Sequence, residues 1–326
     1  MNNLKQNITS IVQKTALALL IATSVTGAAC AAGGAIKGAP EAKYVDWSWA
    51  GVFGTFDRAQ LQRGYQVYKE VCASCHSMDL IKFRNLNEAG GPEFSEAQVK
   101  TLAAEYEIEG GPDAEGEMFT RPRLPKDPFP APFANKNAAM ASNGGAFPPD
   151  LSLIAKARGH YSFKDLFMGR DGLVGGPNYV YNLLTGYEDE VPQYILDHDK
   201  EVNAKALEAY NKALVEYNEA GDNSLRKPDA PTPHNFDLGE SSFNNHFSGN
   251  KISMSQPLSE DSVEYTDGTK ATLEQHAEDV STFLIWAAEP KMEERKRIGI
   301  KILLYLIILA GLMYAVKRRI WENVRH

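Results

Sequence analysis

Cysteine is scarce in this chain, whose 326 residues contain only Cys30, Cys72 and Cys75. Cys30 lies in an N-terminal segment that we expect to be removed, which leaves two cysteines in the mature chain. If Cys72 and Cys75 are needed for other chemistry, no cysteine is spare for a structural disulfide. A zinc site would need two further ligands at related spacing, and no further cysteine is present to supply them.

Basic residues are sparse in the middle of the chain. The whole chain carries −8, its first 31 residues carry +2 and residues 291–326 carry +6, which leaves −16 for residues 32–290. Such an acidic body argues against binding to nucleic acid, whose protein partners are basic. It suits a basic protein partner that is attracted electrostatically, although acidity also simply keeps a domain soluble.

The N-terminus has the pattern of a secretory signal. Lys5 and Lys14 precede a short apolar run at residues 16–25, and Ala29-Cys30-Ala31 fits the small-residue cleavage pattern. A lipid-modified Cys30 is disfavoured, because Gly27 stands where a leucine is usual. We therefore expect residues 1–31 to be removed on export.

One long apolar run follows near the C-terminus. Residues 298–316 are long enough to cross a bilayer as a helix, with basic residues on both sides. Those flanks leave the orientation ambiguous, so the export signal decides it. We expect a periplasmic domain at 32–290, a basic collar and anchor at 291–319 in the bacterial inner membrane, and a cytoplasmic tail at 320–326.

The exported body has few regular elements. Apolar spacing and capping residues predict helices at 57–76, 95–106, 151–158, 178–184, 201–220 and 272–288. The remainder is rich in Gly, Pro and Glu and reads as loop, and no internal repeat is present. The prediction is a mainly α, loop-rich domain with one C-terminal transmembrane helix. A domain with so much loop needs something besides its regular secondary structure to pack around, and a buried haem would meet that need.

The sequence Cys72-Ala73-Ser74-Cys75-His76 is the C-x-x-C-H pattern of covalent haem attachment. Two thioethers hold the vinyl groups of one porphyrin, and the following histidine supplies the proximal ligand of the iron. A redox dithiol is the alternative for a bare C-x-x-C, but the adjacent histidine, the export signal and the lack of a βαβ pattern disfavour it.

The second axial ligand stays open at this point. Methionine is the preferred class, because His/Met ligation raises the reduction potential of an electron carrier. Spacing alone selects none of the candidates, which are His160, His198, His234, His246, His276, Met78, Met118, Met140, Met168, Met254 and Met292.

Several segments resemble the cytochrome c1 family, in family order from about residue 45 to 320. They are RGYQVYKEVCASCHSM (63–78), FPPDLSLIAKAR (147–158), NYVYNLLTGY (178–187), KISMSQPL (251–258) and DVSTFLIWAAEPKMEERKRIGIKILLY (279–305). The resemblance is to the bacterial, alphaproteobacterial form. Residues 160–177 and 201–229 are longer than the mitochondrial pattern, which puts the docking surface in doubt but not the haem.

The resemblance implies a class I c-type cytochrome domain with one covalent haem c, tethered by Cys72 and Cys75. It implies iron ligation by His76 and Met254, with Pro257 stiffening the loop of Met254. By the same resemblance, the haem propionates are held by Arg158, Tyr179 and Asn143.

The implied function is respiratory electron transfer in the ubiquinol:cytochrome c oxidoreductase complex. The family accepts one electron from a Rieske iron–sulfur protein, beside a cytochrome b subunit, and passes it to a soluble c-type cytochrome. No side chain is expected to make or break bonds, since the cofactor carries the redox chemistry. Either of two acidic stretches, 88–117 or 188–201, is a candidate surface for a basic acceptor.

Two other functions share part of this pattern. A membrane-anchored monohaem cytochrome that donates electrons to an oxidase or reaction centre has the same motif, signal and anchor. Compact single-haem cytochromes usually have a far shorter interval than that from His76 to Met254, which disfavours this alternative. A haem enzyme with an open iron position would bind cyanide or carbon monoxide.

Overall fold

The computed structural model describes residues 36–159, 175–220 and 226–322. The expected leader at 1–31, most of the insertion at 160–177 and the end of the expected tail lie outside these residues. The described chain divides into two compact units. The larger unit contains residues 41–190 and 238–322, and the smaller contains residues 36–40 and 191–237.

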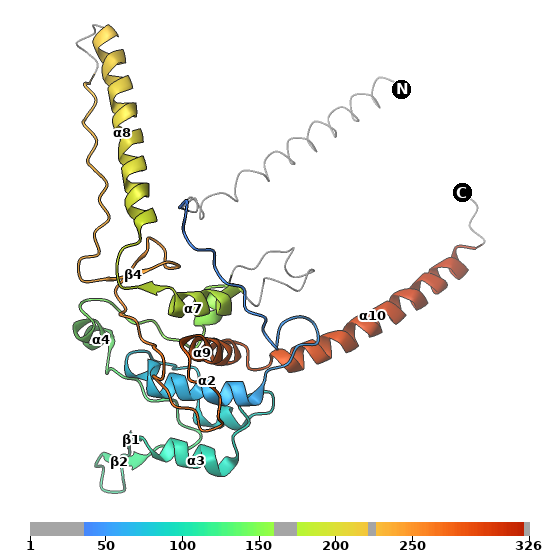
Figure 1. Cartoon of the computed structure of the whole chain (residues 1–326). Coiled ribbons are helices and arrows are strands. Elements are labelled where there is room, and N and C mark those ends of the chain that lie inside the picture. The colour runs from blue at the N-terminus through green and yellow to red at the C-terminus, as the bar shows by residue number, and fades with distance from the viewer. Residues whose placement is uncertain (1–35, 160–174, 221–225, 323–326) are drawn as a thin grey trace. The chain divides into compact units, whose positions relative to one another are not determined.

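The larger unit is mainly helical and loop-rich, as predicted (Figure 1). Its α-helices are α2 (Arg58–Glu70), α3 (Glu96–Ala104), α4 (Lys136–Ser142), α5 (Ile154–Ala157), α7 (Gly175–Thr185), α9 (Leu273–Ala288) and α10 (Met292–Ile320). Two 3₁₀ helices, η1 (Cys72–Ser74) and η2 (Phe83–Asn87), follow α2.

Its strands are short and antiparallel. Strands β1 (Glu107–Gly110) and β2 (Phe119–Pro122) form a hairpin in which Glu107 is opposite Pro122 and Gly110 is opposite Phe119. Strands β3 (Tyr187–Glu188), β4 (Ser242–Asn244) and β5 (Lys251–Ile252) form a second small sheet in that order. This sheet brings the end of α7 next to the segment that contains Met254.

The N-termini of α2 and α9 are set by their capping residues. The Asp57 carboxylate accepts hydrogen bonds from the Ala59 and Gln60 amides, and the Thr272 hydroxyl accepts from the Gln275 amide. The Gln60 side chain does not close a capping box, because it donates to Glu278 on α9 instead. Gln60 therefore links the two helices.

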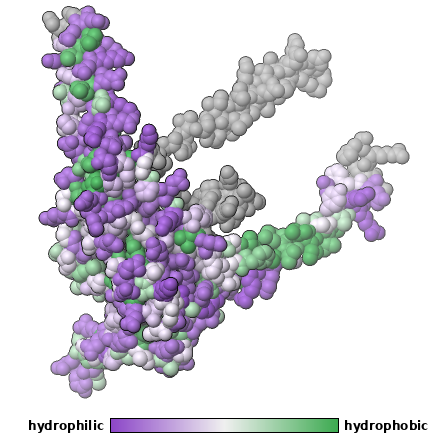
Figure 2. All heavy atoms as spheres, in the orientation of Figure 1, coloured by the Kyte–Doolittle hydropathy of each residue, from purple (hydrophilic) through white to green (hydrophobic). Residues whose placement is uncertain are grey.

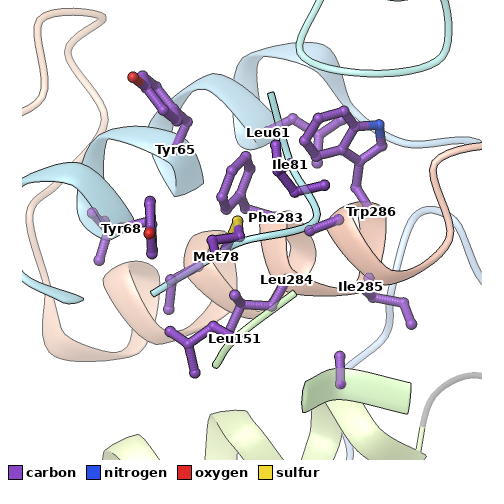
Figure 3. Packing of buried hydrophobic residues seen from close by; sticks show 14 of the residues in the cluster. Leu61, Tyr65, Tyr68, Met78, Ile81, Leu151, Phe283, Leu284, Ile285 and Trp286 are labelled. Carbon is purple, nitrogen blue, oxygen red and sulfur yellow. The ribbon is translucent and has the colours of Figure 1, made fainter. Parts of the chain in front are cut away.

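The core lies where α2 crosses α9 (Figure 3). Leu61 of α2 and Phe283 of α9 are fully buried there, and Tyr65 and Tyr68 pack their rings against Phe283. Apolar side chains of this size contribute roughly 1.5–3 kcal/mol each when they are fully buried. The crossing therefore fixes the helix that leads directly into Cys72.

A buried ion pair joins the same two helices. Arg63 of α2 donates from Nε and Nη2 to the Asp279 carboxylate of α9, at 2.8 and 3.1 Å, and the Asp279 side chain is fully buried. Asp267 accepts from the same guanidinium at 2.9 Å. A buried carboxylate needs such a partner, so this pair fixes how α2 and α9 are aligned.

Helix α10 is the one helix of the described residues that is long and apolar enough to cross a membrane. Its apolar side chains are exposed along most of its length, as the green stretch in Figure 2 shows. The structure therefore agrees with the predicted C-terminal anchor. It extends the helix on both sides of the apolar run at 298–316.

The smaller unit is built around α8 (Gln193–Ala220). The chain returns along this helix, where the Asp199 carboxylate contacts His234 Nδ1 at 2.7 Å and accepts from the Phe236 amide at 2.6 Å. Asn203 exchanges two hydrogen bonds with the backbone of His234. The helix starts at Gln193, earlier than the predicted residue 201, because polar residues at 197–200 obscure the apolar spacing.

Candidate haem-attachment site

The C-x-x-C-H motif forms a tight turn at the end of α2. The Cys75 and His76 amides both donate to the Cys72 carbonyl, at 3.2 and 2.9 Å, and the Ser74 hydroxyl donates to the Val71 carbonyl. Cys72 and Cys75 are both half-buried and form no disulfide. Burial raises the pKa of the Cys72 thiol to about 12, which keeps it protonated.

The His76 imidazole is oriented by a backbone carbonyl. Its Nδ1 lies 2.8 Å from the Pro149 carbonyl, which can only accept, so Nδ1 carries the proton. Burial lowers the pKa of His76, and the bond to Pro149 opposes that shift only in part. The result is a neutral imidazole whose Nε2 remains available, as a metal ligand must be.

Asp150 fixes the loop that follows His76. Its Oδ2 accepts from the Ser77 hydroxyl and the Asp79 amide, and its Oδ1 accepts from the Ser152 amide, all at 2.8 Å. Burial acts to raise the pKa of Asp150, but these donors outweigh it and lower the pKa. Asp150 was not among the expected site residues, and its only signal in the sequence is an acid directly after Pro148 and Pro149.

A hollow of about 250 Å³ lies beside Cys75. Phe147 and Pro148 form part of its wall, together with Ala139 of α4 and residues 131–136. The Phe147 side chain is 49% exposed, although an aromatic ring of this size is normally covered. Ser77, Asp79 and Lys136 also line the hollow, so its wall is partly polar. A hollow next to a half-buried thiol and an oriented imidazole fits one edge of a covalently held porphyrin.

Met254 follows β5, on the segment that the small sheet joins to α7. The Tyr187 hydroxyl donates to the Met254 carbonyl at 3.1 Å, and burial raises the pKa of Tyr187. Met254 is half-buried, and the hydrogen bonds of the described residues include none to its sulfur. Its backbone is held while its thioether stays available. Sequence analysis missed Tyr187, although its position closes the quoted segment 178–187.

The structure narrows the open question of the second axial ligand. Met78 and Met292 are 1% and 0% exposed in the apolar core, and Met78 packs next to Phe283 (Figure 3). His276 is fully buried, with Nδ1 bound to the Tyr265 hydroxyl at 2.9 Å. His160 and Met168 lie outside the described residues. Met254 remains a candidate that is neither buried in the core nor engaged through its sulfur.

Two of the three expected propionate partners lie together. The Arg158 guanidinium at the end of α5 lies 6.0 Å from the centre of the Tyr179 ring on α7. Arg158 is exposed, and no carboxylate of the described residues pairs with it. A guanidinium beside a phenol suits an anionic ligand. Asn143 ends α4 and donates to the Ala139 carbonyl at 2.7 Å, so no polar contact joins it to this pair.

Comparison with known proteins shows which family the chain belongs to. The model of the Cytochrome C1 family matches residues 47–324. A cytochrome c1 of Rhodospirillum rubrum is 42% identical over 98% of this chain and 100% of its own length. The yeast mitochondrial heme protein cytochrome c1 is 38% identical over 86% of this chain and 72% of its own length.

A cytochrome b/c1 of Bradyrhizobium diazoefficiens is 44% identical over 85% of this chain, which spans only 35% of that longer protein. The family model covers far more than half of the chain, and a relative is matched along its whole length. These matches confirm the expected family and its bacterial form, with one covalent haem c, membrane anchoring and a role in respiratory electron transfer. The chain belongs to the cytochrome c1 family.

Proposed function

We propose that this chain accepts one electron from a Rieske iron–sulfur protein and passes it to a soluble c-type cytochrome, within a ubiquinol–cytochrome c reductase complex that also contains a cytochrome b subunit. The observation that carries this proposal is the His76 imidazole, which follows two half-buried thiols and is turned by the Pro149 carbonyl so that Nε2 is available. Haem c, when bound, supplies a one-electron redox couple.

The residues that would hold the haem have separate tasks. Cys72 and Cys75 would form the two thioether links, and His76 and Met254 would ligate the iron. Pro149 and Asp150 fix the orientation of His76, and Tyr187 fixes the backbone of Met254. Such outer contacts set how strongly a ligand donates to the metal and therefore tune its reduction potential.

The propionates are the remaining feature to be held. Arg158 and Tyr179, which lie together, offer a cation and a hydroxyl to one carboxylate. The Asn143 amide nitrogen donates one N–H to the Ala139 carbonyl, and its second N–H could donate to a carboxylate. Ala139 itself lines the hollow beside Cys75.

The membrane topology completes the proposal. Residues 1–31 are a removed leader, 32–290 face the periplasm, 291–319 form the collar and anchor, and 320–326 lie in the cytoplasm. The break between α9 and α10 at residues 289–291 supports the boundary before the anchor. The Glu289 carboxylate pairs there with Lys156 and Arg295, which ties the collar to the haem-carrying body.

Electron delivery to a basic acceptor needs a negatively charged surface. Among the nine acids at residues 88–117, the ion pairs of the described residues involve Glu88, Glu93, Glu96 and Glu105. The other five lie on the β1–β2 hairpin, where all are exposed: Glu107, Glu109, Asp113, Glu115 and Glu117. This hairpin is the part of that stretch whose charge is free to attract a partner.

Purification through a C-terminal tag in mild detergent tests the function directly. A reduced-minus-oxidised spectrum should show c-type and b-type haem bands together, and quinol should reduce added cytochrome c. A c-type band alone in intact, stable material would instead favour an anchored carrier that serves an oxidase or reaction centre.

A further inference from the structure

A short loop next to the start of α10 displays two large apolar side chains. Val52 is 58% exposed and Phe53 is 83% exposed, the highest value for a large hydrophobic residue in the described part of the chain. Residues 47–56 contain no charged residue, between Asp46 and Asp57. Single exposed apolar residues are ordinary, but two adjacent ones in a charge-free segment indicate contact with something apolar.

The loop is held firmly at both ends, so this exposure does not come from a loose chain. Trp49 is fully buried and Phe56 is 4% exposed, with their ring centres 5.9 Å apart. Gly51 adopts a φ of +72°, which a glycine tolerates best, and turns the chain outward. Residues 50–54 therefore project from two anchored aromatic residues.

The same loop is fastened to the first turns of α10. Lys296 Nζ donates to the Trp49 carbonyl at 2.6 Å and to the Gly54 carbonyl at 3.1 Å, so one ammonium holds both ends of the loop. The Phe56 amide donates to Glu293 at 2.7 Å. Lys296 precedes the apolar run by two residues, which is about 3 Å along a helix axis.

We propose that loop 50–54 is a second membrane contact, in which Val52 and Phe53 insert into the boundary between headgroups and acyl chains beside α10. A lipid surface fits better than a soluble partner, because the loop is fixed at the level where the lipid-facing surface of α10 begins. It also lacks charge, and apolar side chains bind a bilayer interface through their buried area. The haem-carrying body is then held at two points and cannot swivel freely about the anchor.

Spin-labelled lipids test this contact in the full holo-chain with its native partners, reconstituted in lipid nanodiscs. Phe53→Cys and, separately, Val52→Cys are labelled with an environment-sensitive fluorophore, and emission is compared between spin-labelled and ordinary lipid. That ratio cancels any quenching by haem. Met118→Cys is the matched control, since Met118 on the β1–β2 hairpin is also 58% exposed. Leu306→Cys on α10 reports whether the anchor itself lies in lipid.

We expect labels at 52 and 53 to emit at shorter wavelength and to be quenched several-fold more strongly than the label at 118. Water-like, unquenched emission at both loop positions, with the label at 306 quenched, would overturn the loop contact while leaving the anchor intact. Shifted but unquenched emission would mean that a protein covers the loop, and it would also overturn the proposal. Water-like, unquenched emission from the label at 306 would refute the anchor on which the inference rests.

Discussion

Helix α9 packs so closely against Gly64 of α2 that the structure has no room for a larger side chain there. A Cβ there would lie 2.1 Å from the Asp279 carbonyl and 2.7 Å from the Phe283 Cβ. Alanine in a helix gains roughly 0.5–1 kcal/mol over glycine, whereas overpacking a core costs about 1–3 kcal/mol. We expect Gly64→Ala to lower the urea midpoint of unfolding in detergent. Gly299→Ala, whose Cβ would meet no neighbour in the described residues, should leave that midpoint unchanged or raised.

Asp150 is the residue whose contacts bear most directly on the orientation of His76. Its two oxygens accept three hydrogen bonds, and Asp150→Asn replaces one of these acceptors by a donor. Leaving buried donors unpaired costs about 1–3 kcal/mol. We expect fewer chains to carry haem, measured as haem per protein in purified membranes. Asp197→Asn is the matched control, since Asp197 is an exposed acid on α8 in the smaller unit, and normal haem content in both variants would contradict this role.

At the scale of elements, the base of the β1–β2 hairpin is held by an ion pair that responds to acid. Arg121 of β2 donates from Nη1 and Nη2 to the Asp127 carboxylate at 2.7 and 3.1 Å, and the Leu124 amide donates to it at 2.8 Å. The bond from Arg121 lowers the pKa of Asp127 to about 2, against an opposing effect of burial. Because this pKa lies below the ordinary value near 3.9, the stabilisation is complete above that value and is lost as pH falls toward about 2.

We therefore expect Asp127→Asn to destabilise the hairpin at neutral pH by a small amount, because solvent reaches the guanidinium. The difference from the unmodified chain should shrink as the pH falls through about 2. Amide hydrogen exchange of hairpin peptides, compared between the two proteins at each pH, measures this loss. Arg121→Gln should have the same effect, and the double variant should be no worse than either. A difference that persists unchanged at pH 2 would exclude the ion pair as its cause.

For the molecule as a whole, the sequence predicted what depends on local chemistry. The C-x-x-C-H motif, the Thr272 cap and the apolar anchor are each contained in one short segment. Met78 and Met254 are equivalent by residue type, and only the crossing of α2 and α9 buries Met78 in the core. Asp150 acquires its contacts because the chain returns to Ser77 after 73 residues. Contacts between residues so far apart in the sequence produce no local pattern, so they could not be predicted from the sequence.

The net charge of −16 on residues 32–290 is a property of the whole molecule, but steering requires that it be placed where the acceptor approaches. If the free acids of the β1–β2 hairpin do this, the triple variant E109K/E115K/E117K should reduce basic cytochrome c several-fold more slowly at low ionic strength. Its rate should meet that of the unmodified chain at high salt, where charges are screened beyond roughly one Debye length. Stopped-flow reduction of cytochrome c across a salt series measures both the rate at low ionic strength and its dependence on salt.

The matched control changes net charge equally at another place. The triple variant E208K/E216K/E219K reverses three acids of α8, which lies in the smaller unit. If location matters, this variant should keep nearly the original salt dependence, because a surface charge acts on an encounter mainly within about 10 Å at moderate salt. Equal loss in both variants would assign the attraction to total charge alone. An unchanged reduction rate in both variants would mean that the hairpin acids are simply solvated and do not attract the acceptor.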